Sequence, residues 1–105
     1  MKKKLFNKLV RDNIINKIKD EGRIPNYRIM KNDEFIKELN KKLLEETCEF
    51  IENNTIEELA DVFEVILKIM EVMNISFDEF ERFRMKKKNE NGGFEQKIYL
   101  IDVNE

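Results

Sequence analysis

Two pairs of acidic residues within strongly apolar stretches constrain this chain more than any other feature. Between residues 43 and 70, apolar side chains recur three and four positions apart, which predicts two amphipathic helices. The acids are Glu46 and Glu49 in the first helix, and Glu58 and Asp61 in the second. The first acid of each pair lies inside the apolar arc of its helix, and the second lies at the edge of that arc. Because a carboxylate among apolar side chains is costly unless it is paired or binds a metal, these positions require an explanation.

A short polar segment, residues 52–55, separates the two predicted helices and favours an antiparallel helical hairpin. Counted from this turn at about 1.5 Å rise per residue, the centres of the two acidic pairs lie within roughly 3 Å of the same height. Facing helix axes stand about 8–10 Å apart, a gap that carboxylate side chains can bridge through one or two cations. The hairpin therefore predicts that the four carboxylates converge on a metal site.

Each acid has a simpler interpretation when it is taken alone. Glu58 completes the capping-box pattern Thr55-x-x-Glu58 of a helix start. Glu49 and Asp61 fit the description of solvated surface acids, and so does Glu45, although it is close enough to the others to act beside a metal. These interpretations leave the joint pattern unexplained, because both arms of one hairpin carry an acid pair with one member facing the core.

Composition excludes several classes of function. The 105 residues include no histidine, so catalytic triads with histidine, histidine zinc sites and histidine bases are excluded. The three glycines form no phosphate-binding loop, so any bound phosphate must be held by cationic side chains. With 20 basic and 22 acidic residues the formal net charge is −2, which disfavours binding to long nucleic acids.

One cysteine and the lack of a signal-like segment lead us to expect a reducing, cytoplasmic setting, and no apolar run approaches membrane-spanning length. The predicted helix over residues 56–73 is apolar nearly all round, which indicates burial on more than one side. We therefore expect a homodimer or a tetramer.

Helix start and stop signals predict four helices within a single domain, residues 1–105. The first precedes Gly22, the second runs from Asn32 or Asp33 to about Ile51, the third from Ile56 to Met73, and the fourth from Ser76 to the stop at Asn91-Gly92-Gly93. Residues 23–31 and 94–103 are irregular or rich in branched and aromatic side chains, and we expect them to pair as a small two-stranded β element. The predicted fold class is all-α.

Four basic residues are candidates to hold phosphate: Lys8, Arg11, Lys86 and Lys87. Each also has a simpler interpretation. A surface ion pair accounts for Arg11, and lysines in the last turns of a helix are commonly dipole-stabilising surface residues.

The acidic residues also form a familiar pattern. Residues 42–49, KLLEETCE, and residues 58–62, ELADV, together resemble the EExxE…ExxD signature of the all-α NTP pyrophosphatases, the MazG-like superfamily. The KLVRD sequence at 8–12 and GGFE at 92–95 are similar to its small single-domain branch, the phosphoribosyl-ATP pyrophosphohydrolase-like or house-cleaning proteins.

This resemblance implies a four-helix MazG-like bundle in which Glu46, Glu49, Glu58 and Asp61 bind Mg²⁺. The implied reaction is hydrolysis of a standard or non-standard nucleoside triphosphate between its α- and β-phosphates, which yields a monophosphate and pyrophosphate. The residue chemistry agrees, since all-oxygen ligands select hard cations such as Mg²⁺ or Mn²⁺. Without histidine, a carboxylate must orient or deprotonate the attacking water, and the candidates are Glu45 and Glu49.

Two other functions stay open at this point. One is the phosphoribosyl-ATP hydrolysis step of histidine biosynthesis, which shares the fold and the reaction type. The other is a non-catalytic helical dimer that keeps the acidic hairpin as a metal-binding or partner-binding surface.

Overall fold

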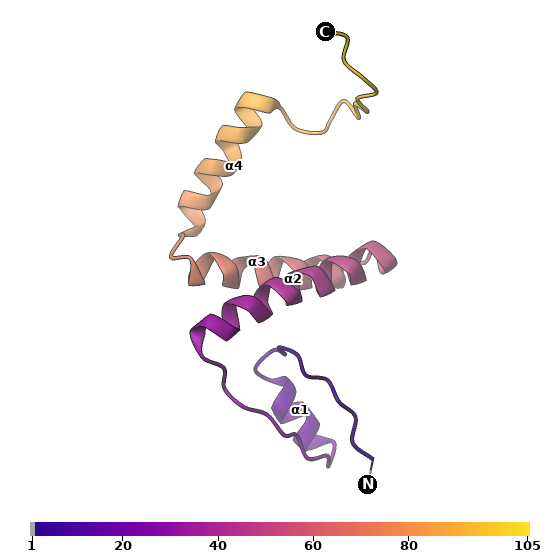
Figure 1. Ribbon diagram of the computed structural model, residues 1–105, viewed down its shortest axis with the longest axis vertical. Coiled ribbons are helices and arrows are strands. Elements are labelled where there is room, and N and C mark those ends of the chain that lie inside the picture. Colours follow the sequence, from indigo (N-terminus) through magenta and orange to yellow (C-terminus); the bar gives the residue numbers. More distant parts are fainter. Residues whose placement is uncertain (1) are drawn as a thin grey trace.

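The computed structural model describes residues 2–105, which form four α-helices and no strand (Figure 1). The helices are α1 (Ile14–Asp20), α2 (Asn32–Asn53), α3 (Ile56–Val72) and α4 (Phe77–Asn91). The predicted all-α class is confirmed, and the bounds of the two central helices agree with the sequence signals to within two residues. None of the four helices is long and apolar enough to cross a membrane.

Helices α2 and α3 form the predicted hairpin and lie side by side at the centre of the molecule (Figure 1). The turn depends on Asn54, which adopts the left-handed conformation at φ 52° and ψ 43°, and whose N–H donates to the Phe50 carbonyl at 2.7 Å. Asparagine tolerates this region better than most residues. The next residue, Thr55, caps α3 by accepting a hydrogen bond from the Glu58 N–H at 3.2 Å.

The apolar core lies along this hairpin and is small. Its buried hydrophobic residues are Leu39 on α2, and Val65 and Met70 on α3. Glu46, on α2, is the one buried charged residue among those that the structure describes. A carboxylate is therefore built into the main packing interface of the chain.

The predicted β element is wrong. Residues 23–31 and 94–103 are irregular, and they lie toward opposite ends of a molecule that extends 64 Å along its longest axis (Figure 1). The tail is exposed, with Tyr99 at 89% and Ile101 at 84% of full exposure. Branched and aromatic residues favour strands only where a neighbouring chain segment is within reach of their backbone, and no segment within residues 2–105 lies beside the tail.

The four helices do not close into a bundle within one chain. Helices α1 and α4 lie on opposite sides of the hairpin, and neither has a buried residue (Figure 1). The radius of gyration is 18.9 Å, whereas a compact chain of this length has about 13 Å. The predicted four-helix arrangement is thus present as a central hairpin with two outlying helices.

Candidate metal centre

The hairpin brings three of the four predicted metal ligands together. One carboxylate oxygen from each of Glu46, Glu58 and Asp61 lies within 4.8 Å of the other two. We call these three residues the acidic cluster. Glu46 comes from α2 and the other two come from the first turns of α3, so the register set by the turn at Asn54 determines whether they meet.

Glu46 is the buried member of the cluster, with 8% of its surface exposed. Its Oε1 lies 3.3 Å from Lys42 Nζ, whereas its Oε2 is buried and has no hydrogen-bond partner. Burial raises the pKa of Glu46, and contact with the Glu49 carboxyl raises it further. A buried carboxylate oxygen without a donor is costly, and a bound cation would satisfy it.

Glu49 lies beside Glu46 at the edge of the cluster, one turn further along α2. It is half-buried and lies close enough to Glu46 to raise the pKa of the Glu46 carboxyl. Glu49 is thus adjacent to the three converging oxygens without being one of them.

Glu58 combines a capping role with a place in the cluster. Its backbone N–H donates to Thr55 Oγ1, but its side-chain Oε1 accepts from Asn53 Nδ2 at 3.2 Å. The described contacts include none from its carboxylate back to the Thr55 N–H, so only the first half of the predicted capping box forms. The carboxylate is instead turned toward α2 and the other acids.

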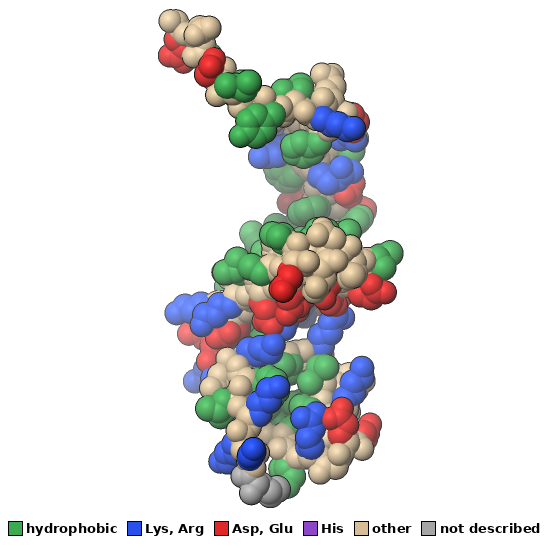
Figure 2. Space-filling model, turned by 90° about the vertical axis from the view of Figure 1, so that its right-hand side faces the viewer, with side chains coloured by type: hydrophobic (Ala, Val, Ile, Leu, Met, Phe, Trp, Pro, Cys, Tyr) green, Lys and Arg blue, Asp and Glu red, His purple; other side chains and the backbone are tan. Residues whose placement is uncertain are grey.

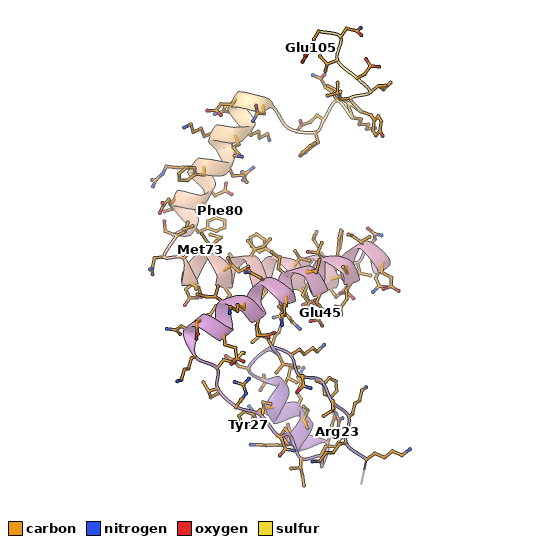
Figure 3. All side chains as sticks on the ribbon, viewed as in Figure 1. Arg23, Tyr27, Glu45, Met73, Phe80 and Glu105 are labelled. Atoms are coloured by element: carbon orange, nitrogen blue, oxygen red, sulfur yellow. The ribbon has the colours of Figure 1, made fainter. Side chains whose placement is uncertain are left out.

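Three cationic side chains surround the acids, and we call them the cationic rim: Lys8, Arg11 and Lys42. Lys8 Nζ donates to Glu45 Oε1 at 2.7 Å, and Arg11 Nη2 donates to Asp61 Oδ1 at 2.7 Å. Figure 2 shows acidic side chains gathered on the side of the hairpin that faces the N-terminal segment, with basic side chains opposite them. In Figure 3, Glu45 lies on this same side of α2.

Glu45 is held in its ionised form by two lysines. The hydrogen bond from Lys8 lowers the pKa of Glu45, and Lys42, 3.5 Å from its Oε2, lowers it further. The same hydrogen bond raises the pKa of Lys8. Glu45 is therefore held in its ionised form more firmly than the neighbouring Glu46, whose pKa is raised.

Lys42 is a site residue that the sequence motifs did not identify. Its side chain is 14% exposed and lies between Glu45 and Glu46. The signal was available, because Lys42 precedes these acids by three and four residues, which places all of them on one helix face.

Two of the predicted phosphate-binding residues lie elsewhere in this chain. Lys86 and Lys87 belong to α4, which leaves the end of the hairpin on the side away from the N-terminal segment (Figure 1). Lys87 lines a surface hollow with Arg84, Lys88 and residues 91–95. Lys8 and Arg11 contact the acidic side of the hairpin, whereas a single chain does not bring Lys86 and Lys87 to it.

The donor atoms of the site are all carboxylate oxygens, with no sulfur or nitrogen among the cluster members. This set fits a hard divalent cation such as Mg²⁺ or Mn²⁺, and the unpartnered Glu46 Oε2 supplies a place for it. The chain matches no protein-family model, no curated protein and no solved structure. The case for a function therefore rests on the residues and their geometry.

Proposed function

We propose that this protein is a Mg²⁺-dependent nucleoside triphosphate pyrophosphohydrolase with the MazG-like all-α arrangement. The reaction is hydrolysis between the α- and β-phosphates to give a nucleoside monophosphate and pyrophosphate. The observation that carries the proposal is the buried, unpartnered Oε2 of Glu46, a residue that clusters with Glu58 and Asp61.

The acidic cluster, with Glu49 beside it, would hold the metal. When bound, Mg²⁺ neutralises charge on the phosphates and lowers the pKa of an attacking water. The protein's own contribution is to fix the oxygen donors in place from two packed helices before the substrate arrives. Preformed geometry of this kind reduces the rearrangement that the reaction requires.

Glu45 and Glu49 are the two acids available to act on water. Lys8 and Lys42 keep Glu45 ionised, so it can accept a hydrogen bond from the attacking water and orient it as the new P–O bond forms and pyrophosphate departs. Glu49 shares a contact with Glu46 and is better placed to complete the metal site.

Lys8 and Arg11 stand at the edge of the site and would contact the phosphates. Lys86 and Lys87 would join them only from a second copy of the chain or after movement of α4. A second copy is also favoured by an apolar hollow on the outer face of α3. This hollow is lined by Ile56, Leu59, Ala60, Val62, Phe63 and Ile66. We therefore propose a homodimer or tetramer.

The test is product analysis with a panel of nucleoside triphosphates and phosphoribosyl-ATP in the presence of Mg²⁺. We expect pyrophosphate and a monophosphate, with activity abolished by EDTA and reduced by roughly tenfold or more in Glu46→Gln. Release of orthophosphate with a diphosphate would contradict the mechanism. Turnover of phosphoribosyl-ATP alone would indicate the histidine-biosynthesis activity, and metal binding without turnover would indicate the non-catalytic dimer.

A further inference from the structure

The N-terminal segment crosses the acidic side of the hairpin and contacts both of its helices. Lys8 pairs with Glu45 on α2, and Arg11 pairs with Asp61 on α3. The backbone from Lys8 to Arg11 can reach at most roughly 10 Å, which is sufficient for the 8–10 Å between facing helix axes. The segment is bounded by Asn7, at a positive φ of 44°, and by a hydrogen bond from the Ile14 N–H to the Arg11 carbonyl at 3.0 Å.

The Arg11 pair differs from the Lys8 pair in one respect. Glu45 lies outside the three converging oxygens, whereas Asp61 is a member of the acidic cluster. Arg11 therefore donates to a carboxylate that the proposed function assigns to the metal. A guanidinium and a divalent cation beside the same carboxylate repel each other, so each weakens the binding of the other.

The Arg11–Asp61 ion pair can also break at little cost in stability. The side chain of Arg11 is 56% exposed and that of Asp61 is 40% exposed. Exposed ion pairs of this kind contribute little to stability. The planar guanidinium can form two parallel hydrogen bonds with phosphate oxygens, so a nucleotide at the mouth of the site offers Arg11 a stronger partner.

We propose that Arg11 is a resident counter-ion that pairs with Asp61 in the empty site and moves to the phosphates when nucleotide and metal bind. This role of Arg11 rests on the proposed metal site. It adds a coupling between binding of the metal and binding of the nucleotide. When the metal binds alone, it competes with Arg11 for the Asp61 carboxylate. When nucleotide binds as well, Arg11 has moved to the phosphates and this competition is removed. Each ligand therefore strengthens the binding of the other.

Binding measurements with Arg11→Gln test this coupling. Removing the competing cation should tighten binding of Mn²⁺ alone by roughly two- to fivefold, as expected for loss of one exposed ion pair. The same variant should bind an α,β-methylene nucleoside triphosphate with Mg²⁺ roughly tenfold more weakly, because a charge-assisted contact with phosphate is lost. Titration calorimetry measures both. The two effects have opposite signs, which general damage to the protein would not produce.

Two further variants serve as controls. Arg11→Lys keeps the charge but loses the planar fork, so its Mn²⁺ affinity should stay near that of the wild type while nucleotide affinity recovers in part. Arg28→Gln removes an exposed arginine that pairs with Glu34 away from the site, and both affinities should be unchanged. Circular dichroism checks that helix content is preserved in each variant.

The outcomes separate this inference from the proposed function. If wild-type protein binds Mn²⁺ and Glu46→Gln does not, but Arg11→Gln leaves either affinity unchanged or weakens both, the counter-ion role is wrong and the metal site stands. If the wild type and Glu46→Gln bind Mn²⁺ equally, or neither binds it, the proposed site fails and this inference fails with it.

In unmodified protein, the ¹⁵Nε resonance of Arg11 should sharpen on addition of Mg²⁺ and broaden or shift again with the nucleotide analogue. A resonance unmoved by the analogue would overturn the transfer to phosphate.

Discussion

Glu46 combines properties that conflict in the metal-free protein. It is buried in the main interface, it lies beside other acids, and one of its oxygens has no partner. Two ionised carboxylates within 4.8 Å of each other repel by roughly 3 kcal/mol at an effective dielectric near 20, and the cationic rim offsets only part of this. If the cluster binds a metal as proposed, stability is reduced here in favour of binding.

Glu46→Gln should therefore stabilise the metal-free protein while impairing its response to metal. Glutamine keeps the size of the side chain and removes the charge, so we expect the melting temperature without metal to rise by about 5 °C. Stabilisation by added Mg²⁺ should largely disappear. Thermal melts with and without Mg²⁺ measure both effects. Glu52→Gln, at an exposed position near the end of α2, is the control and should change neither.

The size of this effect should depend on pH. Because the pKa of Glu46 is raised in the folded state, its contribution to stability is present at low pH and is lost as pH rises through the folded-state pKa. The difference in melting temperature between Glu46→Gln and wild type should thus be small near pH 4 and larger near pH 7. If Glu46→Gln is less stable than wild type at both pH values, Glu46 is a structural hydrogen-bonding residue and the proposed site is wrong.

At the scale of single residues, the predicted inward position is confirmed for Glu46, which is buried, whereas Glu58 is only half-buried. Helical periodicity places Glu46 and Glu58 on the apolar faces without knowledge of the fold. Periodicity does not reveal which basic residue pairs with each acid, because Arg11, which pairs with Asp61, is 50 residues away in the sequence. The spacing of Lys42 from Glu45 and Glu46 is a weaker signal, since a lysine near glutamates on a helix usually lies on a solvated face.

Among the elements, the turn between α2 and α3 has the greatest influence on the site. Thr55 caps α3 through the N–H of Glu58, so one hydrogen bond fixes the helix start and the residue that carries a cluster carboxylate. Ser76 makes the equivalent bond to the Glu79 N–H at the start of α4, which is remote from the acids. The chain therefore offers two matched caps, only one of which is connected to the site.

Replacing each cap by alanine should separate these roles. Thr55→Ala should destabilise the protein by about 1 kcal/mol and weaken Mn²⁺ binding, because the first turn of α3 frays. Ser76→Ala loses the same hydrogen bond but should leave Mn²⁺ affinity unchanged. Urea denaturation and Mn²⁺ titration measure the two quantities. Equal loss of Mn²⁺ affinity in both variants would show that the effect is global rather than local.

Helix ends were predictable because their signals are local. The capping hydroxyls of Thr55 and Ser76 lie three residues from the N–H groups that they bind. The β element over residues 23–31 and 94–103 was wrong because a strand depends on a partner that is distant in sequence. Local preference for extended backbone is real in these segments, but the part of one chain that the structure describes provides no strand for them to pair with.

At the scale of the whole molecule, the isolated chain exposes far more surface than a compact protein of its mass. Its accessible area is 10073 Å², whereas a folded monomer of 12.7 kDa exposes about 6,200 Å². Exposed apolar residues on α3 include Ile56 at 79% and Leu59 at 52%. The three buried hydrophobic side chains among residues 2–105 are too few to offset the conformational entropy of a chain this long.

We therefore expect light scattering at micromolar concentration to give a mass of at least twice 12.7 kDa. Phe63→Lys, in the apolar hollow on α3, should shift the population toward monomer and lower the melting temperature, because a charge there cannot be buried against a second copy. Ile24→Lys is the control, since Ile24 is more exposed, at 76%, and lies outside the hairpin. A wild-type protein that scatters as a monomer would contradict this expectation.

The cationic rim also sets the charge balance of the site. The acidic cluster and the flanking Glu45 and Glu49 carry five formal negative charges at neutral pH, and the three rim cations leave two of them uncompensated. A single divalent ion makes the assembly electrically neutral. A second divalent ion would then meet a site with no excess negative charge, unless it arrived already chelated by the phosphates of a nucleotide. If the acidic cluster binds metal as proposed, the empty protein is suited to one divalent ion, and any further metal would arrive with the substrate.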